Sequence, residues 1–307
     1  MYCNIYQAGA GMKKLLLYIF LLKVFFTQAQ TQQQWEQLVE WDGVSHFSKY
    51  ILFNAGHMGP NALPVPSITS GNIDSMSYLG TSGQLHLSKG DKTQNINIYG
   101  NFCLAKNLVS VEVAWIPVEF FKTSDAIKME RHVYYQNYHD KRAKGDVLFS
   151  THINLLNKWR VKTQLSLRAG VRLPASSSKG MAAARFIDAT SYWVDVSMGK
   201  QINKRIKWMC MAGLFVWQIN KDDLKQDDAF LFGTGFEWNK NNWKLQTYIA
   251  GYLGYMANSG DKPIVIRMNA EKRFAKTSLF FCLQQGIHDF KYTSAETGVK
   301  WLLKLQQ

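Results

Sequence analysis

One long segment of the sequence alternates apolar and polar side chains, and this constrains the fold. The segment is WRVKTQLSLRAGVRLP, residues 159–174. Because successive side chains of an extended chain point to opposite faces, Val161, Leu165, Leu167 and Val171 would share one apolar face. The other face carries polar and basic residues, namely Lys162, Gln164, Ser166, Arg168 and Arg172. Such a strand needs an apolar environment on one side and a wet one on the other.

Segments of the same kind recur from about residue 78 to the end of the chain. We predict twelve β-strands, at residues 79–89, 93–104, 108–120, 146–157, 159–173, 191–202, 205–218, 229–239, 242–256, 263–273, 276–287 and 291–304. Their connections alternate in length. AKN, NK, NKR, NKNN and FAK are tight turns, whereas most of the intervening connections are longer, at 121–145, 173–190, 219–228 and 257–262.

Two fold classes can use such strands. A soluble sandwich buries one face of each strand in a core. A transmembrane barrel of the outer-membrane type has an even number of strands, short periplasmic turns, long outer loops and apolar side chains that face lipid. The even count and the alternating connections favour an all-β, antiparallel transmembrane β-barrel over a secreted soluble β-protein. The chain has no apolar run of the roughly 18 residues that a membrane-spanning helix needs.

The beginning of the chain has the layout of a secretory signal peptide. The stretch MKKLLLYIFLLKVFFTQAQ starts at Met12 with two lysines, continues with an apolar core and reaches a plausible cleavage site near Ala29. We therefore expect a leader at 1–29, an N-terminal periplasmic or plug-like segment at 30–77 and a transmembrane β-barrel at 78–307. The mature protein would reside in the outer membrane of a Gram-negative cell.

The segment before the barrel contains three of the six prolines of the chain, in NAGHMGPNALPVPSI at 54–68. Prolines at this spacing exclude a central strand and favour an extended segment that is ordered in advance. Pro60, Asn61, Pro64 and Pro66 are the residues that we expect to plug the lumen or seal its mouth. The alternative is a linker that packs against the barrel rim.

Two stretches resemble a known family. GPNALPVP at 59–66, and RAGVRLP at 168–174 followed by ARFIDATSYWVDVSMGK at 184–200, resemble a family of uncharacterised outer-membrane β-barrels of Bacteroidota-type bacteria. The resemblance implies a barrel in the outer membrane and supplies no substrate or catalytic residue. A looser likeness is to barrels associated with hydrocarbon-degradation pathways, which implies uptake of small hydrophobic compounds.

Charged residues on the polar faces of the strands are expected to line the lumen. The candidates for lining the lumen and binding a solute are Glu112, Lys162, Arg168, Arg172, Asp195, Arg267 and Glu271. They could brace a narrow barrel as a lattice of ion pairs, or they could form a passage for anions or amphiphiles. Bulky residues share the same inward parity and favour a narrow or closed interior, namely Phe215, Trp217, Tyr248 and Tyr252.

Enzymatic chemistry finds little support in the sequence. Ser150 and His152 share one face of a strand and could belong to a lipid hydrolase, but a pair in the middle of a luminal face is wrongly placed for membrane lipid. His132, His139 and Asp140 lie in the longest loop without a recognised metal-site spacing. We therefore predict a non-enzymatic protein with no cofactor and no metal.

The basic charge of +14 raises the question of partners. A secretion signal without a nucleic-acid-binding motif argues against nucleic acid. We expect outer-membrane lipid and lipopolysaccharide, whose phosphates would meet Lys141, Arg142 and Lys144, together with the barrel-assembly machinery. The predicted function is passage or binding of a small anionic or amphiphilic solute. The alternative is a sealed structural or interaction barrel that docks envelope partners, and an outer-membrane lipid hydrolase is a distant third.

Overall fold

The structure is a computed structural model that describes residues 31–73, 75–134, 141–158, 162–176, 178–219, 225–256 and 259–303. The leader expected at 1–29 lies outside the described residues, as do His139 and Asp140. No helix among the described residues is long and apolar enough to cross a membrane.

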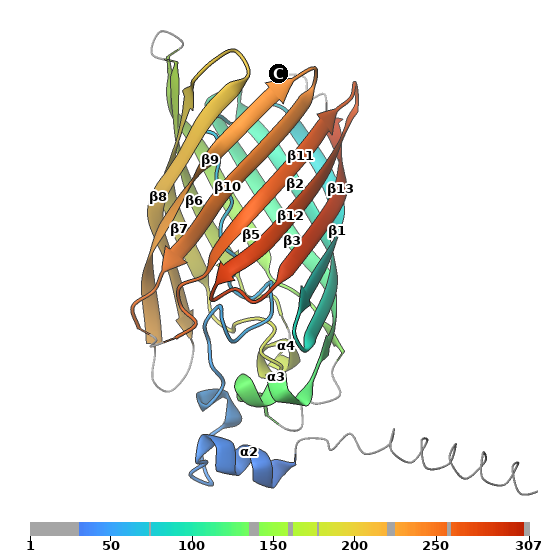
Figure 1. The fold of residues 1–307 in the computed structure, drawn as a ribbon, viewed down its shortest axis with the longest axis vertical. Helices are drawn as coiled ribbons and strands as arrows, with labels where there is room; N and C mark the ends of the chain where they lie inside the picture. The colour runs from blue at the N-terminus through green and yellow to red at the C-terminus, as the bar shows by residue number, and fades with distance from the viewer. Residues whose placement is uncertain are drawn as a thin grey trace, which may run out of the picture.

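Twelve long antiparallel strands form the wall of a closed barrel (Figure 1). They are β1 (Ser77–Ser88), β2 (Asp91–Ala105), β3 (Val109–Thr123), β5 (Val147–Lys158), β6 (Thr163–Leu173), β7 (Ser191–Gln201), β8 (Ile206–Ile219), β9 (Lys225–Lys240), β10 (Trp243–Leu253), β11 (Ile264–Arg273), β12 (Thr277–His288) and β13 (Thr293–Leu303). Each strand pairs with its neighbours along the chain, and β1 pairs with β13 to close the sheet. A thirteenth strand, β4 (Arg142–Ala143), is a two-residue addition to β3 that the alternation did not predict.

The alternation of the sequence places apolar side chains outside the barrel and polar ones inside. In β6, Ser166, Arg168 and Arg172 are buried in the interior, whereas Leu173 on the other face is exposed. Many other outward-facing residues are large and apolar, among them Leu79, Ile96, Ile98, Val194, Val196, Leu214, Phe236, Leu245, Ile266, Leu279, Phe281 and Leu283. The predicted antiparallel β-barrel is confirmed, and its twelve strands agree with the observed bounds to within a few residues at each end.

The two ends of the barrel differ in their connections. One end, the short-turn end, carries the tight turns that follow β2, β5, β7, β9 and β11. The other end, the long-loop end, carries the long connections with α3 (Asp125–Glu130) and α4 (Ser178–Ala182). Helix α2 (Gln32–Val39) lies at this end as well, where Trp35 Nε1 donates to the carbonyl of His132 at 3.1 Å. The 3-10 helix η1 (Phe47–Lys49) follows α2.

After η1 the chain enters the barrel and runs through it to the short-turn end (Figure 1). Gly56 N donates to the carbonyl of Gly260 in the β10–β11 connection at the long-loop end. Further along, Gly71 packs against the backbone of Gln164 and Gly199, which lie near the short-turn end. A positive φ of 69° and the absence of a side chain permit this close approach, because a Cβ on Gly71 would stand 2.5 Å from the Gln164 carbonyl oxygen.

We call residues 54–73 the plug segment, since they lie inside the barrel. The part of the chain that precedes them, with α2 and η1, lies at the long-loop end. A periplasmic position, as predicted for 30–77, would require the short-turn end in the usual arrangement of outer-membrane barrels. The side of the membrane expected for 30–77 stays a prediction, but residues 31–53 lie at the long-loop end of the barrel. The reason is that residues 54–73 cross the lumen before β1 begins.

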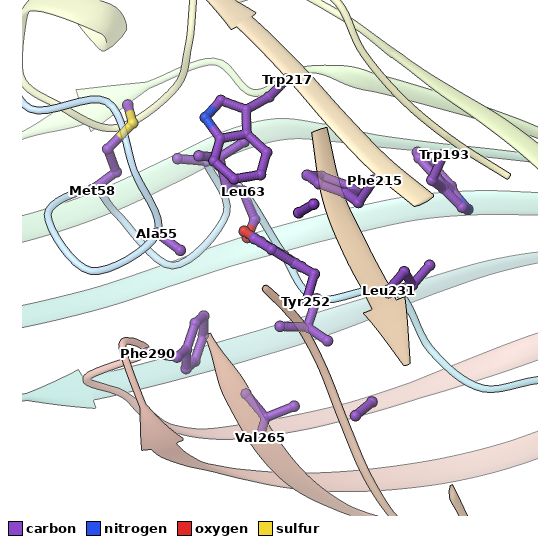
Figure 2. Packing of buried hydrophobic residues seen from close by; sticks show 14 of the residues in the cluster. Ala55, Met58, Leu63, Trp193, Phe215, Trp217, Leu231, Tyr252, Val265 and Phe290 are labelled. Atoms are coloured by element: carbon purple, nitrogen blue, oxygen red, sulfur yellow. The ribbon is translucent and has the colours of Figure 1, made fainter. Parts of the chain in front are cut away.

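The main apolar core lies inside the barrel, between the plug segment and the wall. Met58 and Leu63 of the plug segment are fully buried beside rings from β8 and β10. Phe215 and Tyr252 stack with ring centroids 4.7 Å apart, and Figure 2 shows Tyr252 directed toward Leu63. The inward-facing bulky residues expected to narrow the lumen are therefore packed against the plug segment. This packing makes the plug segment part of the folded core.

Candidate functional site

The plug segment is held by side chains of the wall that donate to its backbone. Tyr252 Oη donates to the Leu63 carbonyl at 2.9 Å, Arg267 Nη2 to Val65 at 2.6 Å and Arg168 Nη2 to Ser67 at 2.8 Å. These carbonyls belong to alternate residues of an extended chain. Proline lacks an N–H, so this stretch presents an excess of acceptors. Donors from β6, β10 and β11 satisfy these acceptors.

Arg168 links the plug segment to the wall through an ion pair. Its Nε lies 2.7 Å from Asp195 Oδ2, and both side chains are almost fully buried. The two residues face each other in the register of β6 and β7, which explains why they meet. Both were predicted to line the lumen, and both lie inside the barrel.

Arg172 is less well satisfied. It is 2 % exposed, its Nη1 reaches the carbonyl of Asn61 at 3.4 Å, and its Nε lies 3.5 Å from Asp146 Oδ2 without a hydrogen bond. Arg172 Nε and Nη2 have no hydrogen-bond partner among the described residues. An arginine of this kind, fully buried and partly unpaired, is a candidate for contact with a ligand.

Of the other residues predicted to line the lumen, Glu271 and Glu112 lie inside the barrel, whereas Lys162 lies in a turn. Glu271 accepts from Ser278 Oγ at 2.6 Å and pairs with Lys300 at 2.8 Å. Glu112 lies 3.4 Å from His152. Lys162 is not in the lumen: it is exposed in the β5–β6 turn, with a φ of 53°. The prediction for Lys162 is wrong because β6 begins at Thr163, so the strand alternation does not reach it.

A buried charge network lies inside the barrel at the long-loop end. Arg185, from the β6–β7 connection, pairs with Asp91 and Glu119 at 2.7 Å each, and all three side chains are fully buried. Arg131 also pairs with Asp91 at 2.7 Å. Burial alone would lower the pKa of Arg185, but Glu119 and Asp91 outweigh it and raise that pKa above its ordinary value. Arg185 therefore keeps its positive charge at any physiological pH.

The same network fixes the start of the plug segment. Asn61 Nδ2 donates to Glu119 at 2.6 Å, and Gly59 N donates to the Ala184 carbonyl at 2.8 Å. A Cβ on Gly59 would stand 2.7 Å from the guanidinium carbon of Arg185, so only glycine fits there. GPNALPVP and the ARFID stretch thus pack against each other. Arg185 was quoted in that motif but not predicted as a site residue, because nothing in a loop sequence indicates its distant acidic partners.

The rest of the lumen is hollow. A main cavity of about 740 Å³ extends from Asn61 past Thr69 to Asn239 and Arg273 near the short-turn end. Its lining mixes polar and apolar side chains, and the polar members include Tyr99, Glu112, Lys207, Glu237, Lys244, Gln246, Arg267, Asn269, Glu271, Glu296 and Lys300. A smaller cavity of about 210 Å³ lies between Pro64 and Pro66 of the plug segment and the wall. Asn61 borders the main cavity, so all four residues predicted for the plug lie inside the barrel.

Ser150, His152 and Glu112 do not form a catalytic relay. Ser150 Oγ lies 3.1 Å from His152 Nε2, and Glu112 Oε2 lies 3.4 Å from the same nitrogen. A serine hydrolase needs the nucleophile on one ring nitrogen and the orienting acid on the other. Within the described residues, no group of three or more His, Cys, Asp and Glu side chains could hold a metal ion.

The sequence and the fold of the chain can be compared with those of known proteins. No family model matches the chain, and no curated protein matches it in sequence. Among solved structures, an outer-membrane channel from Pseudomonas putida F1 is similar with a TM-score of 0.51 at 10 % identity, over 79 % of this chain and 97 % of that one.

Two further structures have lower scores. The monoaromatic hydrocarbon channel CymD has a TM-score of 0.42 at 9 % identity, over 83 % of this chain and 100 % of that one. The translocator domain of the autotransporter NalP from Neisseria meningitidis has a TM-score of 0.40 at 8 % identity, over 75 % and 89 %. The likeness to the Pseudomonas channel shows that this chain has the fold of an outer-membrane β-barrel.

Proposed function

We propose that this protein resides in the bacterial outer membrane and binds and passes a small solute through its lumen, with the plug segment as the gate. The short turns would face the periplasm, as is usual for such barrels. The observation that carries the proposal is the main cavity of about 740 Å³, which runs alongside the plug segment and has both polar and apolar side chains in its lining. The plug segment lines this cavity from Pro60 to Ile73, so we expect passage through the lumen to require this segment to move.

The contacts of the plug segment support such a gate. Its proline stretch is held by hydrogen bonds from Tyr252, Arg168 and Arg267 to backbone carbonyls. Each of these bonds contributes only about 1 kcal/mol, or somewhat more for a charged donor, because water replaces it on release. The wall donors could then turn to a solute carrying acceptor groups, which fits the expected anionic or amphiphilic solute.

The outer surface supports a place next to lipopolysaccharide. Arg142 lies over the ring of Phe120, and Lys144 lies over the ring of Trp115, with distances of 5.9 and 5.7 Å to the ring centroids. Both basic residues are exposed at the long-loop end. Exposed basic side chains, one of them over Phe120 at 51 % exposure, suit the phosphate layer of an outer leaflet. Lys141 remains a predicted member of the same patch.

Single-channel recording in planar bilayers tests the gate. The unaltered protein should show rare openings, and the Tyr252→Phe, Arg267→Met double variant should open more often because two wall donors are lost. The matched control is Tyr192→Phe with Lys276→Met, which removes one outward-facing hydroxyl and one exposed charge. A fully silent double variant with an intact barrel would contradict passage.

That result would favour a sealed barrel that docks envelope partners. The buried network of Arg185, Asp91 and Glu119 is the observation that supports this second function. Ion pairs that are fully buried are costly to separate, so this network would resist opening of the long-loop end. In that case the exposed loops, rather than the lumen, would carry the activity. Binding partners of the intact protein in the outer membrane would then be identified by cross-linking.

A further inference from the structure

The smaller cavity, which we call the side chamber, has the size of a ligand site. It measures about 210 Å³ and lies between Pro64 and Pro66 of the plug segment and the rings of Trp193 and Phe215. These two rings are nearly parallel, with centroids 6.3 Å apart and planes at 27°. An apolar cavity of roughly 150 Å³ is enough to bind benzene. The side chamber therefore has room for one ring or a short branched chain with a small polar group.

Two buried donors in the lining of the side chamber have no hydrogen-bond partner in the described part of the chain. They are Arg172 Nη2 and Trp193 Nε1. Their residues are 2 % and 7 % exposed. Leaving a buried donor unpaired costs about 1–3 kcal/mol, and more when the donor is charged. An acceptor that enters the side chamber would remove this cost at two positions.

The charges around the side chamber favour an anionic acceptor. Arg168 is neutralised by Asp195, whereas Arg267 donates to Gln284 and to the Val65 carbonyl, and no acid of the described residues lies within 4.0 Å of it. Arg172 forms an ion pair with Asp146 at 3.5 Å, which leaves Arg172 Nη2 without a hydrogen bond, so Arg267 is the arginine of the lining with no described acid beside it. The one acid in the lining is Glu112, which is engaged with His152.

We propose that the side chamber binds a compact monocarboxylate. The carboxylate accepts from Arg172 Nη2 and Trp193 Nε1, and a charge-assisted bond to arginine is among the stronger hydrogen bonds in proteins. The apolar body packs against Phe215 and the two prolines. The residues shared with the main cavity, Pro64, Ser67 and Arg267 among them, give the ligand a way in. This inference rests on the proposed function, because it names the class of solute that the same lumen would take.

Binding by the intact barrel in detergent micelles tests the inference without any transport step. The probe is benzoate, its neutral comparison is benzamide, and calorimetry measures the binding, with tryptophan fluorescence as a second readout. We expect saturable binding of benzoate that is at least tenfold tighter than that of benzamide. Arg172→Gln should weaken benzoate binding at least tenfold, whereas Lys276→Gln, which removes an exposed turn charge, should leave it unchanged.

A second variant keeps the test decisive if Arg172→Gln does not fold. Trp193→Phe keeps an aromatic ring and removes only the indole N–H, so it should weaken benzoate several-fold. The inference is overturned if the unaltered barrel does not bind benzoate, if it binds benzamide equally well, or if both folded variants keep full affinity. A barrel that conducts but does not bind benzoate would keep the proposed function and refute only this solute class.

Discussion

The two halves of the lumen contain the same kinds of charged residue in opposite settings. In the long-loop half, the side chains of Arg185, Asp91 and Glu119 are all 0 % exposed. In the short-turn half, Lys300 and Glu271 form an equally direct pair, yet they keep 16 % and 19 % of their surface and line the main cavity. Water screens the second pair and not the first, so losing a partner is costly only in the first. The buried pairs of the long-loop half therefore hold the structure together, whereas the pair in the short-turn half lines a water-accessible cavity.

Removing Arg185 should have the largest effect. Arg185→Met leaves the buried Glu119 with a hydrogen bond from Asn61 but without its cation, and we expect a loss of about 3–5 kcal/mol in the free energy of unfolding. The counterpart, Lys300→Met in the short-turn half, should cost about 1 kcal/mol or less. Urea unfolding in micelles, followed by tryptophan fluorescence, measures both. Equal losses would show that the two halves do not differ.

Truncating the plug segment in the core should come next. Leu63→Ala removes a side chain that is 2 % exposed, and we expect a loss of about 2–5 kcal/mol together with more frequent channel openings. Leu79→Ala is the matched control, because Leu79 faces outward at 46 % exposure. The same unfolding assay and bilayer recordings apply. An unchanged opening frequency in Leu63→Ala would mean that core packing does not hold the gate shut.

Tyr252→Phe should have a smaller effect. It removes the hydroxyl that donates to the Leu63 carbonyl and keeps the ring stacked on Phe215. We expect a loss of about 1 kcal/mol from the closed state, and hence roughly a fivefold rise in open probability. Tyr192→Phe, on the outer face, serves as the control. A larger rise in open probability than with Leu63→Ala would show that the Tyr252 hydrogen bond holds the gate more strongly than the packing of Leu63 does.

Acid should weaken the long-loop half slightly. Burial lowers the pKa of His57, and Lys291 and Arg131 add to this effect, while Glu130 and Asp289 oppose it. The unfolded state therefore takes up a proton first, so stability falls as the pH drops below about 6.5, the ordinary histidine value. Opening frequency measured between pH 7.5 and 5.5 should rise, and His57→Gln should flatten that profile. An identical rise in His57→Gln would assign the effect to the neighbouring carboxylates.

The fold could be predicted almost completely from the sequence, because a strand that faces lipid on one side and water on the other must alternate. Arg168 and Asp195 were placed inside the barrel by this rule alone, and they lie there. Lys162 shows where the rule stops, since β6 begins one residue after it. The path of the plug segment could not be predicted, because prolines indicate an extended chain but not its direction.

The most buried part of the site lay beyond sequence reasoning for a related reason. Arg185 and Asp91 are 94 positions apart and come from a loop and a strand end. No periodicity connects such residues, and three-dimensional closure of the barrel alone brings them together. The two nitrogens of Arg172 without a hydrogen bond were equally hidden, because alternation indicates which face a side chain takes but not whether it finds a partner.

The passage of residues 54–73 through the barrel also dictates an order of assembly. The sheet closes through the pairing of β1 with β13, residues that are more than two hundred positions apart. A chain that folds its wall first would have to push α2 through a finished ring that is filled with side chains. The wall is therefore expected to wrap around its own leading segment, with the β1–β13 seam joining last. In the finished barrel, residues 31 and 303 lie at opposite ends. Tags at these two positions should therefore be accessible from opposite sides of the membrane.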